Sequence, residues 1–139
     1  GAGNDVLLGG AGVDVLLGGD GADFVDGNAG NDVAFLGAGD DTFRWDPGDG
    51  SDTLDGGAGT DRLLFEGSAV GENVNIGANG ARLRFFRDVG SVTQDAGSVE
   101  RVDFNALGGA DTALSRQDRG TWPRQCRGGA SADQISDCL

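Results

Sequence analysis

Aspartate recurs at a fixed spacing through residues 1–64, and a regular row of carboxylates can bind cations. The repeating unit is nine residues long and occurs seven times. Position six is always Asp: Asp5, Asp14, Asp23, Asp32, Asp41, Asp52 and Asp61. Position four is always Gly: Gly3, Gly12, Gly21, Gly30, Gly39, Gly50 and Gly59. Position eight is always apolar: Leu7, Leu16, Val25, Ala34, Phe43, Leu54 and Leu63. Three constant columns indicate a repeat architecture.

Each unit divides into a turn and a short strand. The first six positions are rich in Gly, which tolerates the backbone conformations of tight turns, and they end in Asp. The last three positions place the apolar residue on one face and its two neighbours on the other. One unit alone cannot bury its apolar residue, whereas stacked units bury a continuous narrow core.

Two units are expected to form one coil, so every second turn lies on the same side of the stack. The step along each side is 18 residues, except for one step of 20. The two sides then carry Asp5, Asp23, Asp41 and Asp61, and Asp14, Asp32 and Asp52. An insertion of Trp45 and Asp46 accounts for the longer steps, and we expect it to bulge locally without breaking the coil.

The charge of this stretch requires counter-ions. Residues 1–61 hold 13 Asp against one basic residue, Arg44, and carboxylates at strand spacing repel one another. Calcium accepts six to eight oxygen ligands, and Gly-rich turns present backbone carbonyls freely. Magnesium demands stricter geometry, and zinc prefers His or thiolate ligands, which the repeats lack. We therefore predict about five Ca²⁺ ions, one in each gap between successive turns on the same side.

The predicted calcium ligands are the Asp of position six and Gly carbonyls of the turns. The carboxylate set is Asp5, Asp14, Asp23, Asp32, Asp41, Asp52 and Asp61. The Gly set is Gly3, Gly10, Gly12, Gly19, Gly21, Gly30, Gly39, Gly50 and Gly59. Without calcium, charge repulsion should leave this stretch unfolded.

The pattern G-G-x-G-x-D-x-U-x resembles the hemolysin-type calcium-binding nonapeptide repeats of RTX proteins. The resemblance covers residues 1–64 and implies a parallel β-roll and secretion by a type I system. Three units depart from the pattern, at Asn28, Leu36 and Pro47, which weakens individual turns. The fold class expected is all-β: a right-handed parallel β-roll of about seven units, extended or capped by further strands.

The composition of the 139 residues argues against several functions. The net charge of −13 disfavours nucleic acid, where phosphate contacts need basic residues. The chain has no His, which excludes Ser-His-Asp and Cys-His catalysis, and it has no HExxH or GxSxG motif. No apolar run approaches ~20 residues, so no membrane span is expected. Because residue 1 falls at position two of a unit, we expect further repeats or another domain upstream.

Residues 65–112 are expected to form strands that extend or cap the roll. Strands are predicted over 73–77, 81–87 and 98–104, separated by turns that include Asp95-Ala96-Gly97. The expected core residues are Phe65, Leu83, Phe85 or Phe86, Val102 and Phe104. Half a repeat then returns at Leu107–Thr112, which makes Asp111 a candidate calcium ligand.

Two surfaces invite a binding function. Arg82, Arg84, Arg87 and Arg101 form either a cationic face for a glycan or partner chain, or a solvated strand face paired with the acidic roll. Positions seven and nine are unusually apolar for an outer surface, with Val6, Leu8, Val15, Leu17, Phe24, Val33 and Phe35. The occupants considered are an upstream domain, residues 113–139, or a second copy through self-association.

Residues 113–139 are expected to be an irregular tail. Four Arg fall within twelve residues, and both cysteines, Cys126 and Cys138, lie here. They form a disulfide in an oxidising compartment, or they are free. The tail does not match a type I secretion signal, and its abrupt composition also fits out-of-frame sequence.

The sequence thus predicts a non-enzymatic calcium-binding module of a larger, secreted bacterial protein, which folds on calcium binding outside the cell. The alternatives are a binding or adhesion module for a glycan or protein, and the non-catalytic C-terminal part of a secreted hydrolase or protease. The predicted organisation is a calcium-binding roll at 1–64, an extension or cap at 65–112 and a tail at 113–139.

Overall fold

The computed structural model describes residues 1–105, 107, 112–115, 125–128 and 134–136. These residues form fourteen β-strands and no helix, so the all-β prediction is confirmed. In this part of the chain there is accordingly no helix long and apolar enough to cross a membrane.

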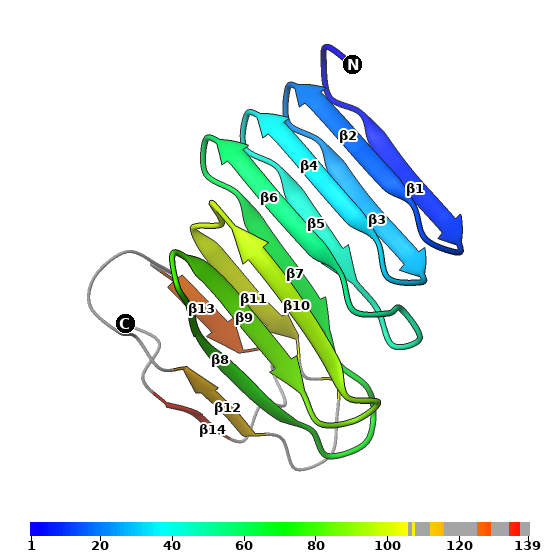
Figure 1. Cartoon of the computed structure of the whole chain (residues 1–139). Helices are drawn as coiled ribbons and strands as arrows, with labels where there is room; N and C mark the ends of the chain where they lie inside the picture. Colours follow the sequence, from blue (N-terminus) through cyan, green and yellow to red (C-terminus); the bar gives the residue numbers. More distant parts are fainter. Residues whose placement is uncertain (106, 108–111, 116–124, 129–133, 137–139) are drawn as a thin grey trace.

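The strands form two sheets that lie against each other (Figure 1). The six-stranded sheet contains, in spatial order, β1 (Val6–Ala11), β3 (Phe24–Ala29), β5 (Thr42–Trp45), β7 (Arg62–Glu66), β11 (Arg101–Asn105) and β13 (Gln125–Gly128). The eight-stranded sheet contains β14 (Gln134–Ser136), β12 (Thr112–Ser115), β8 (Asn73–Asn79), β9 (Arg82–Arg87), β10 (Val92–Gly97), β6 (Thr53–Ala58), β4 (Val33–Ala38) and β2 (Val15–Asp20). Within the segment expected to be irregular, residues 125–128 and 134–136 are therefore strands.

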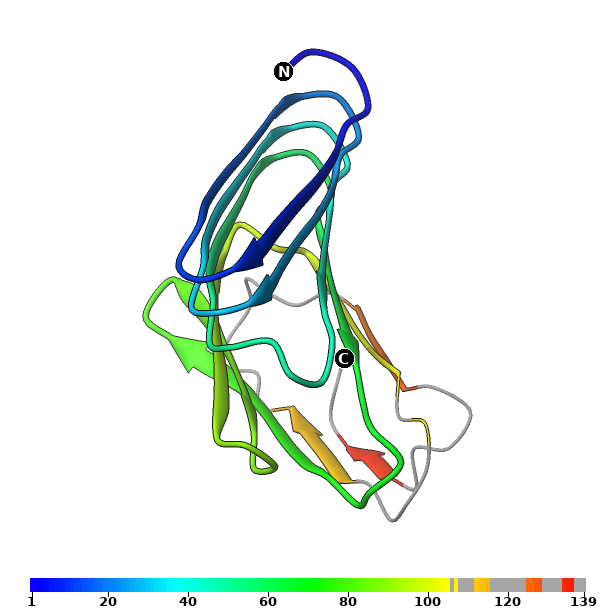
Figure 2. The same ribbon diagram turned by 90° about the vertical axis from the view of Figure 1, so that its right-hand side faces the viewer.

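Consecutive repeats alternate between the two sheets, which makes the chain a flattened coil (Figure 2). Strand β1 pairs in parallel with β3, with Leu7 opposite Val25, a step of 18 residues. Strand β5 pairs in parallel with β7, with Phe43 opposite Leu63, a step of 20. Two units therefore form one coil, and the predicted parallel β-roll is confirmed.

The insertion lies slightly later in the chain than the sequence pattern predicts. Trp45 does not bulge: it continues β5, pairs with Phe65 and is fully buried. The two extra residues instead lengthen the turn that follows, over 46–49, and this longer loop protrudes beyond the neighbouring turns (Figure 1). A large apolar side chain at this point gains more from burial than from a place in the loop, which moves the irregularity into the polar segment.

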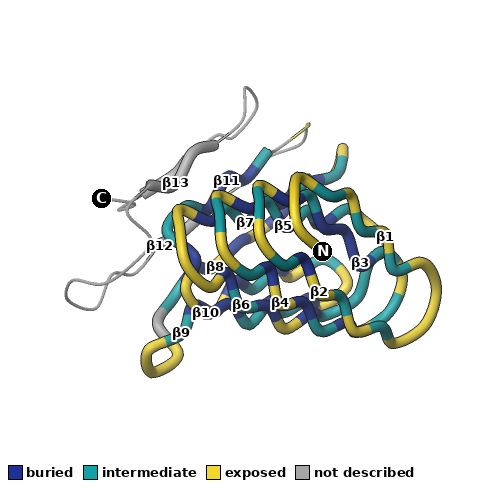
Figure 3. The backbone as a smooth tube through the Cα atoms, turned by 90° about the horizontal axis from the view of Figure 1, so that it is seen from above, coloured by how far each residue is buried: buried dark blue, intermediate teal, exposed yellow. Residues whose placement is uncertain are grey.

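The core lies between the sheets, and buried positions recur along the strands of both sheets (Figure 3). The core side chains become larger along the roll, from half-buried Leu7 and Leu16 at the β1–β2 end to aromatic residues near β11. The Trp45 ring stacks on Phe65 with centroids 4.0 Å apart, and Phe65 lies 4.0 Å from Phe85. Of the two alternatives offered by the sequence, Phe85 is the core residue.

Residues 65–105 continue both sheets, but their strands do not join the eight-stranded sheet in chain order. The chain leaves β7, forms β8 further along the eight-stranded sheet, and returns through the antiparallel strand β9 to β10, which pairs with β6. Two predictions need correction here. Asp95-Ala96-Gly97 is not a turn but the end of β10, and the last predicted strand begins at Arg101 rather than Ser98. Pairing with β6 overrides the local turn preference of these residues.

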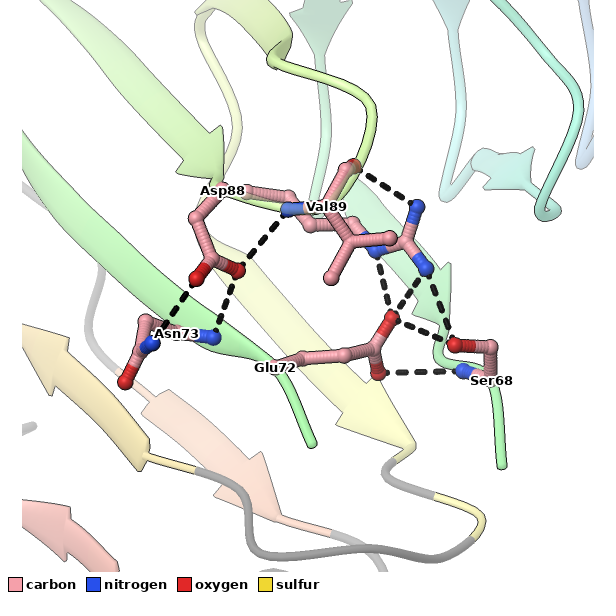
Figure 4. Close-up of polar contacts among 6 residues, drawn as sticks. Ser68, Glu72, Asn73, Asp88 and Val89 are labelled. Carbon is pink, nitrogen blue, oxygen red and sulfur yellow. Dashed lines mark hydrogen bonds and ion pairs between the residues drawn. The ribbon is translucent and has the colours of Figure 1, made fainter. Parts of the chain in front are cut away.

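A buried polar network connects the β8–β9 segment to the rest of the roll (Figure 4). Arg87 was expected on a cationic outer face, yet its side chain is 5% exposed and forms an ion pair with fully buried Glu72. Its guanidinium also donates to Val89 O and to Ser68 Oγ, and it lies 5.1 Å from the Trp45 ring centre. Burying a charged group is tolerated only when it is paired and hydrogen-bonded, and this network meets both conditions.

Replacing Phe65 by Ala should destabilise the roll by about 3–5 kcal/mol, because it leaves a cavity at the centre of the aromatic cluster. Urea unfolding in saturating calcium, followed by circular dichroism, measures this loss. Phe35→Ala is the matched control, since the Phe35 side chain is 50% exposed on the outer face of β4. An equal effect of the two substitutions would contradict the described core.

Candidate functional site

The position-six Asp residues form two hydrogen-bonded ladders, one in the turns at each end of the strands. On one side, the backbone N–H of each Asp donates to Oδ1 of the Asp one coil further on, at 2.7–2.9 Å, through Asp5, Asp23, Asp41 and Asp61. On the other side the same bonds connect Asp14, Asp32 and Asp52 at 2.8 and 2.9 Å. The structure therefore brings all seven predicted carboxylates together in the two predicted rows.

The second carboxylate oxygen of most of these residues has no protein partner. Among the described residues, Oδ2 is buried without a hydrogen bond in Asp14, Asp23, Asp32, Asp41 and Asp61. A buried carboxylate oxygen without a partner costs free energy. The same buried, partnerless Oδ2 recurs from turn to turn, which indicates a common ligand for these atoms rather than isolated local defects.

Position-one glycines, which the sequence prediction omitted, face these oxygens. A methyl group on the Cα of Gly18 would lie 2.2 Å from Leu36 O and 2.5 Å from Asp23 Oδ2. At Gly9 the corresponding distances are 2.5 Å to Gly27 O and 3.0 Å to Asp14 Oδ2. A carboxylate of one turn and a carbonyl of the next thus converge over a glycine that has no side chain to block them.

The predicted glycines of positions two and four allow the backbone conformation that the turns require. A φ between 101° and 152° occurs at Gly3, Gly10, Gly12, Gly19, Gly21, Gly30, Gly39 and Gly59. The turns also stack too closely for side chains, since a methyl group on Gly21 would lie 2.3 Å from Gly3 O. Gly50 lies outside this φ range but is equally close to the preceding turn, with its Cβ position 1.7 Å from Gly30 O.

Position five adds a smaller ladder that the sequence prediction also omitted. Asn4 and Asn31 each accept a hydrogen bond from the backbone N–H of position five in the next turn on the same side, at 2.8 and 2.9 Å. Asp40 does the same for Thr60 at 2.9 Å. The signal was visible as an Asn or Asp directly before the repeated Asp, and it favours turns in fixed register.

Burial raises the pKa of several ladder carboxyls. It raises the pKa of Asp52 to about 7, and the neighbouring Asp32 charge adds to the effect, while the hydrogen bond from the Asp32 backbone opposes it. Burial likewise raises the pKa of Asp61 to about 6, against the hydrogen bond from the Asp41 backbone. These carboxyls resist ionisation unless a cation lies beside them.

The donor set fits a hard divalent cation. Carboxylate and carbonyl oxygens converge, and Ca²⁺ takes such oxygens at 2.3–2.6 Å. The described turns contain no thiolate or imidazole that would favour zinc.

A family model described as the RTX calcium-binding nonapeptide repeat matches the chain in four copies, over residues 1–25, 8–43 and 48–67. Within these ranges the chain consists of RTX calcium-binding nonapeptide repeats. The resemblance drawn from the Gly and Asp columns is thereby confirmed, and the RTX roll is a structural calcium-binding module rather than a member of a catalytic family. No curated protein and no solved structure was found to match the chain.

The arginines considered as a cationic binding face do not share one face. Arg82 pairs with Asp95 at 2.6 Å and with Asp55 of the roll at 3.8 Å. Arg101 lies in the other sheet and pairs with Asp103, while Arg87 is buried. Of the four, Arg84 is the exposed one, and it lies over the Phe86 ring. The candidate ligand Asp111 and the proposed Cys126–Cys138 disulfide lie outside the residues whose side chains are described.

The raised pKa values predict how the calcium-free roll responds to pH. Because the folded pKa of Asp52 and of Asp61 exceeds the ordinary value of 3.8, protonation stabilises the folded state, and this contribution is lost as pH rises through about 6 and about 7. In chelator, the β signal in circular dichroism should therefore be larger at pH 5 than at pH 8. Asp52→Asn should reduce the change between pH 6 and pH 8, whereas Asp20→Asn at the exposed end of β2 should not. A β signal in chelator that grows with pH would contradict this account.

Proposed function

We propose that this roll is the calcium-triggered folding module of a larger secreted protein, in which each gap between adjacent turns holds one Ca²⁺. The observation that carries the proposal is the row of buried Oδ2 atoms without a protein partner. The proposed carboxylate ligands are Asp5, Asp14, Asp23, Asp32, Asp41, Asp52 and Asp61. The turn glycines supply carbonyls and the close approach that the ions need.

The number of ions follows from the number of gaps. Four repeat turns on one side enclose three gaps, and three on the other side enclose two, which gives about five Ca²⁺ per roll. Each gap combines carboxylates from two successive coils with carbonyls of the intervening turns. The ions thereby neutralise the charge that otherwise forces the coils apart.

Calcium binding of this extent is comparable to the stability of a whole domain. At a free calcium level ~10 times the Kd, one site contributes about 1.4 kcal/mol, so about five sites contribute roughly 7 kcal/mol. Extracellular calcium modules typically bind at ~10⁻⁴ to 10⁻³ M. A chain with such sites stays unfolded in the cytosol and folds in the external medium, and RTX repeats are typical of secreted proteins.

The proposed organisation assigns calcium binding to residues 1–64, a cap to residues 65–112 and a tail to residues 113–139, in which β13 and β14 extend the two sheets. Strands β8 to β11 support a capping role, because they continue both sheets and close the core with aromatic residues. The catalytic or other activity of the parent protein would then reside in a domain outside this chain.

A second candidate function, packing against a partner through the outer faces of the first coils, is favoured by side-chain exposure. Val6, Leu8, Val15 and Leu17 are 62–71% exposed on β1 and β2. Val6 and Leu8 lie on the outer face of one sheet, and Val15 and Leu17 on the outer face of the other. Exposed apolar patches are typical of docking surfaces. The arginines do not share one face, so they give much less support to a glycan-binding role than the exposed apolar residues give to partner packing.

Calcium should switch the chain from coil to β-structure. Circular dichroism in chelator at pH 8 should show mainly unfolded chain, and millimolar calcium should restore the β signal because the ions neutralise the ladders. Magnesium at the same concentration is the control and should be much less effective. A full β signal that persists in chelator at pH 8 would overturn the proposed trigger.

Asp32→Asn should remove calcium binding next to the altered turn. Asn keeps an oxygen to accept the Asp14 N–H but loses the charge, so we expect at least one ion fewer per chain and a loss of about 1–3 kcal/mol in calcium. Calorimetric titration counts the ions, and Asp20→Asn, at exposed position three, is the matched control. Equal stoichiometry in both variants would remove Asp32 from the ligand set.

A further inference from the structure

The ladder on the Asp61 side does not end with the last nonapeptide. Strand β11 pairs with β7 so that Glu100 follows Asp61 in the column, although only Ser98 and Val99 precede Glu100 in a shortened turn. Glu100 Oε2 accepts the Asp61 backbone N–H at 2.8 Å, the same bond that Asp61 Oδ1 makes with Asp41 N–H at 2.9 Å. Glu100 therefore occupies the place of the next repeat Asp without belonging to a repeat.

In the repeats, a carboxylate oxygen and a carbonyl oxygen converge over a glycine, an arrangement that we call the oxygen cradle. The same cradle occurs at this point. A methyl group on Gly56 would lie 2.1 Å from Ser98 O and 2.4 Å from Asp61 Oδ2. These distances match those at Gly18, which faces Leu36 O and Asp23 Oδ2 at 2.2 and 2.5 Å. The Asp61 side chain is fully buried, and its Oδ2 has no hydrogen-bond partner. A partnerless buried carboxylate oxygen is thus aimed at a carbonyl from outside the nonapeptides.

No described arginine neutralises this end of the ladder. The nearby side chains of Arg62 and Arg101 both form ion pairs with Asp103 on the outer face of the sheet. Asp61 and Glu100 thus bring two carboxylates together, and a divalent cation is the charge that the site lacks.

The opposite ladder ends differently, which provides an internal comparison. The residue that follows Asp52 in that column is Gln94, since Asp95 pairs with Thr53. Gln94 Nε2 and Trp45 Nε1 both donate to Gly50 O, at 3.1 and 2.9 Å. Neutral protein donors occupy a turn carbonyl there, and although Gln94 Oε1 is buried without a hydrogen-bond partner, no further carboxylate follows Asp52 in this column.

We propose that Asp61, Ser98 and Glu100 hold a further Ca²⁺ that joins the last repeat to the cap. Asp61 and Glu100 supply carboxylate oxygens, Ser98 supplies its backbone carbonyl, and Gly56 leaves the space open. The site rests on the proposed function, because it assumes that the preceding gaps also bind calcium. It extends the metal array beyond the nonapeptides on one side of the roll only.

Calcium stoichiometry of the whole chain tests this site. Glu100→Gln keeps an oxygen for the Asp61 N–H but removes the charge, and it should bind one Ca²⁺ fewer than the unaltered chain. Glu66→Gln is the matched control at the other end of the same strand pair, where Glu66 accepts from Asn105 at 2.9 Å, and it should bind the full number. Calorimetric titration and native mass spectrometry in calcium provide the count.

Equal stoichiometry in Glu100→Gln and the unaltered chain would overturn the site while leaving the repeat sites intact. Absence of any calcium binding by the unaltered chain would instead overturn the proposed function itself. If Glu100→Gln does not fold in calcium, the calcium count of the unaltered chain decides, because the proposed site adds one ion to the five of the repeat gaps. A total of six ions supports the site, and a total of five rejects it.

Discussion

Repulsion between buried carboxylates in register is the constraint on which this structure depends. Each coil places an Asp directly above the Asp of the previous coil, and Oδ1 is already used by the backbone of that neighbour. The hydrogen bond fixes the register but leaves Oδ2 of most ladder residues without a protein partner. Burial raises the pKa of Asp52 and Asp61. The proposed calcium ion in each gap supplies the missing charge. On this proposal, the same ladder that aligns the coils makes their alignment dependent on metal.

The two halves of the molecule are expected to depend on metal to different extents. The first coils contribute small or half-buried core residues such as Leu7, Leu16 and Ala34, so their apolar burial is modest. The later coils and the cap contribute the cluster around Phe65 and the buried Glu72–Arg87 pair, which stabilise the fold without an ion. Stability should therefore pass from metal-dominated to packing-dominated along the chain, with β7 and β11 at the boundary.

The repeat could be predicted from the sequence because each unit is local. A turn, an Asp and an apolar residue recur within nine positions, and parallel stacking follows from the step of 18 residues. The structure of the cap was harder to predict from the sequence, because it depends on contacts between residues that are far apart in the chain. Glu72 meets Arg87 only because β8 and β9 are antiparallel, and Asp95-Ala96-Gly97 becomes a strand only beside β6. The position-one glycines left a signal at Gly9, Gly18, Gly27 and Gly56, but Leu36 and Pro47 interrupt this column in the sequence. In the structure Trp45, which pairs with Phe65, takes the position that the sequence pattern assigns to Pro47.

That interrupted column shows how one backbone position serves two needs. Where position one is Gly, as at Gly18, the missing side chain leaves carboxylate and carbonyl oxygens free to converge on a cation. Where it is Trp45, the side chain instead fills the core, and its indole N–H donates to Gly50 O. An indole donor and the Gln94 amide thus satisfy a turn carbonyl in a place where no further carboxylate follows. On that side no carboxylate follows Asp52, whereas on the side of Glu100 the carboxylate column continues into the cap, where we propose a further cation.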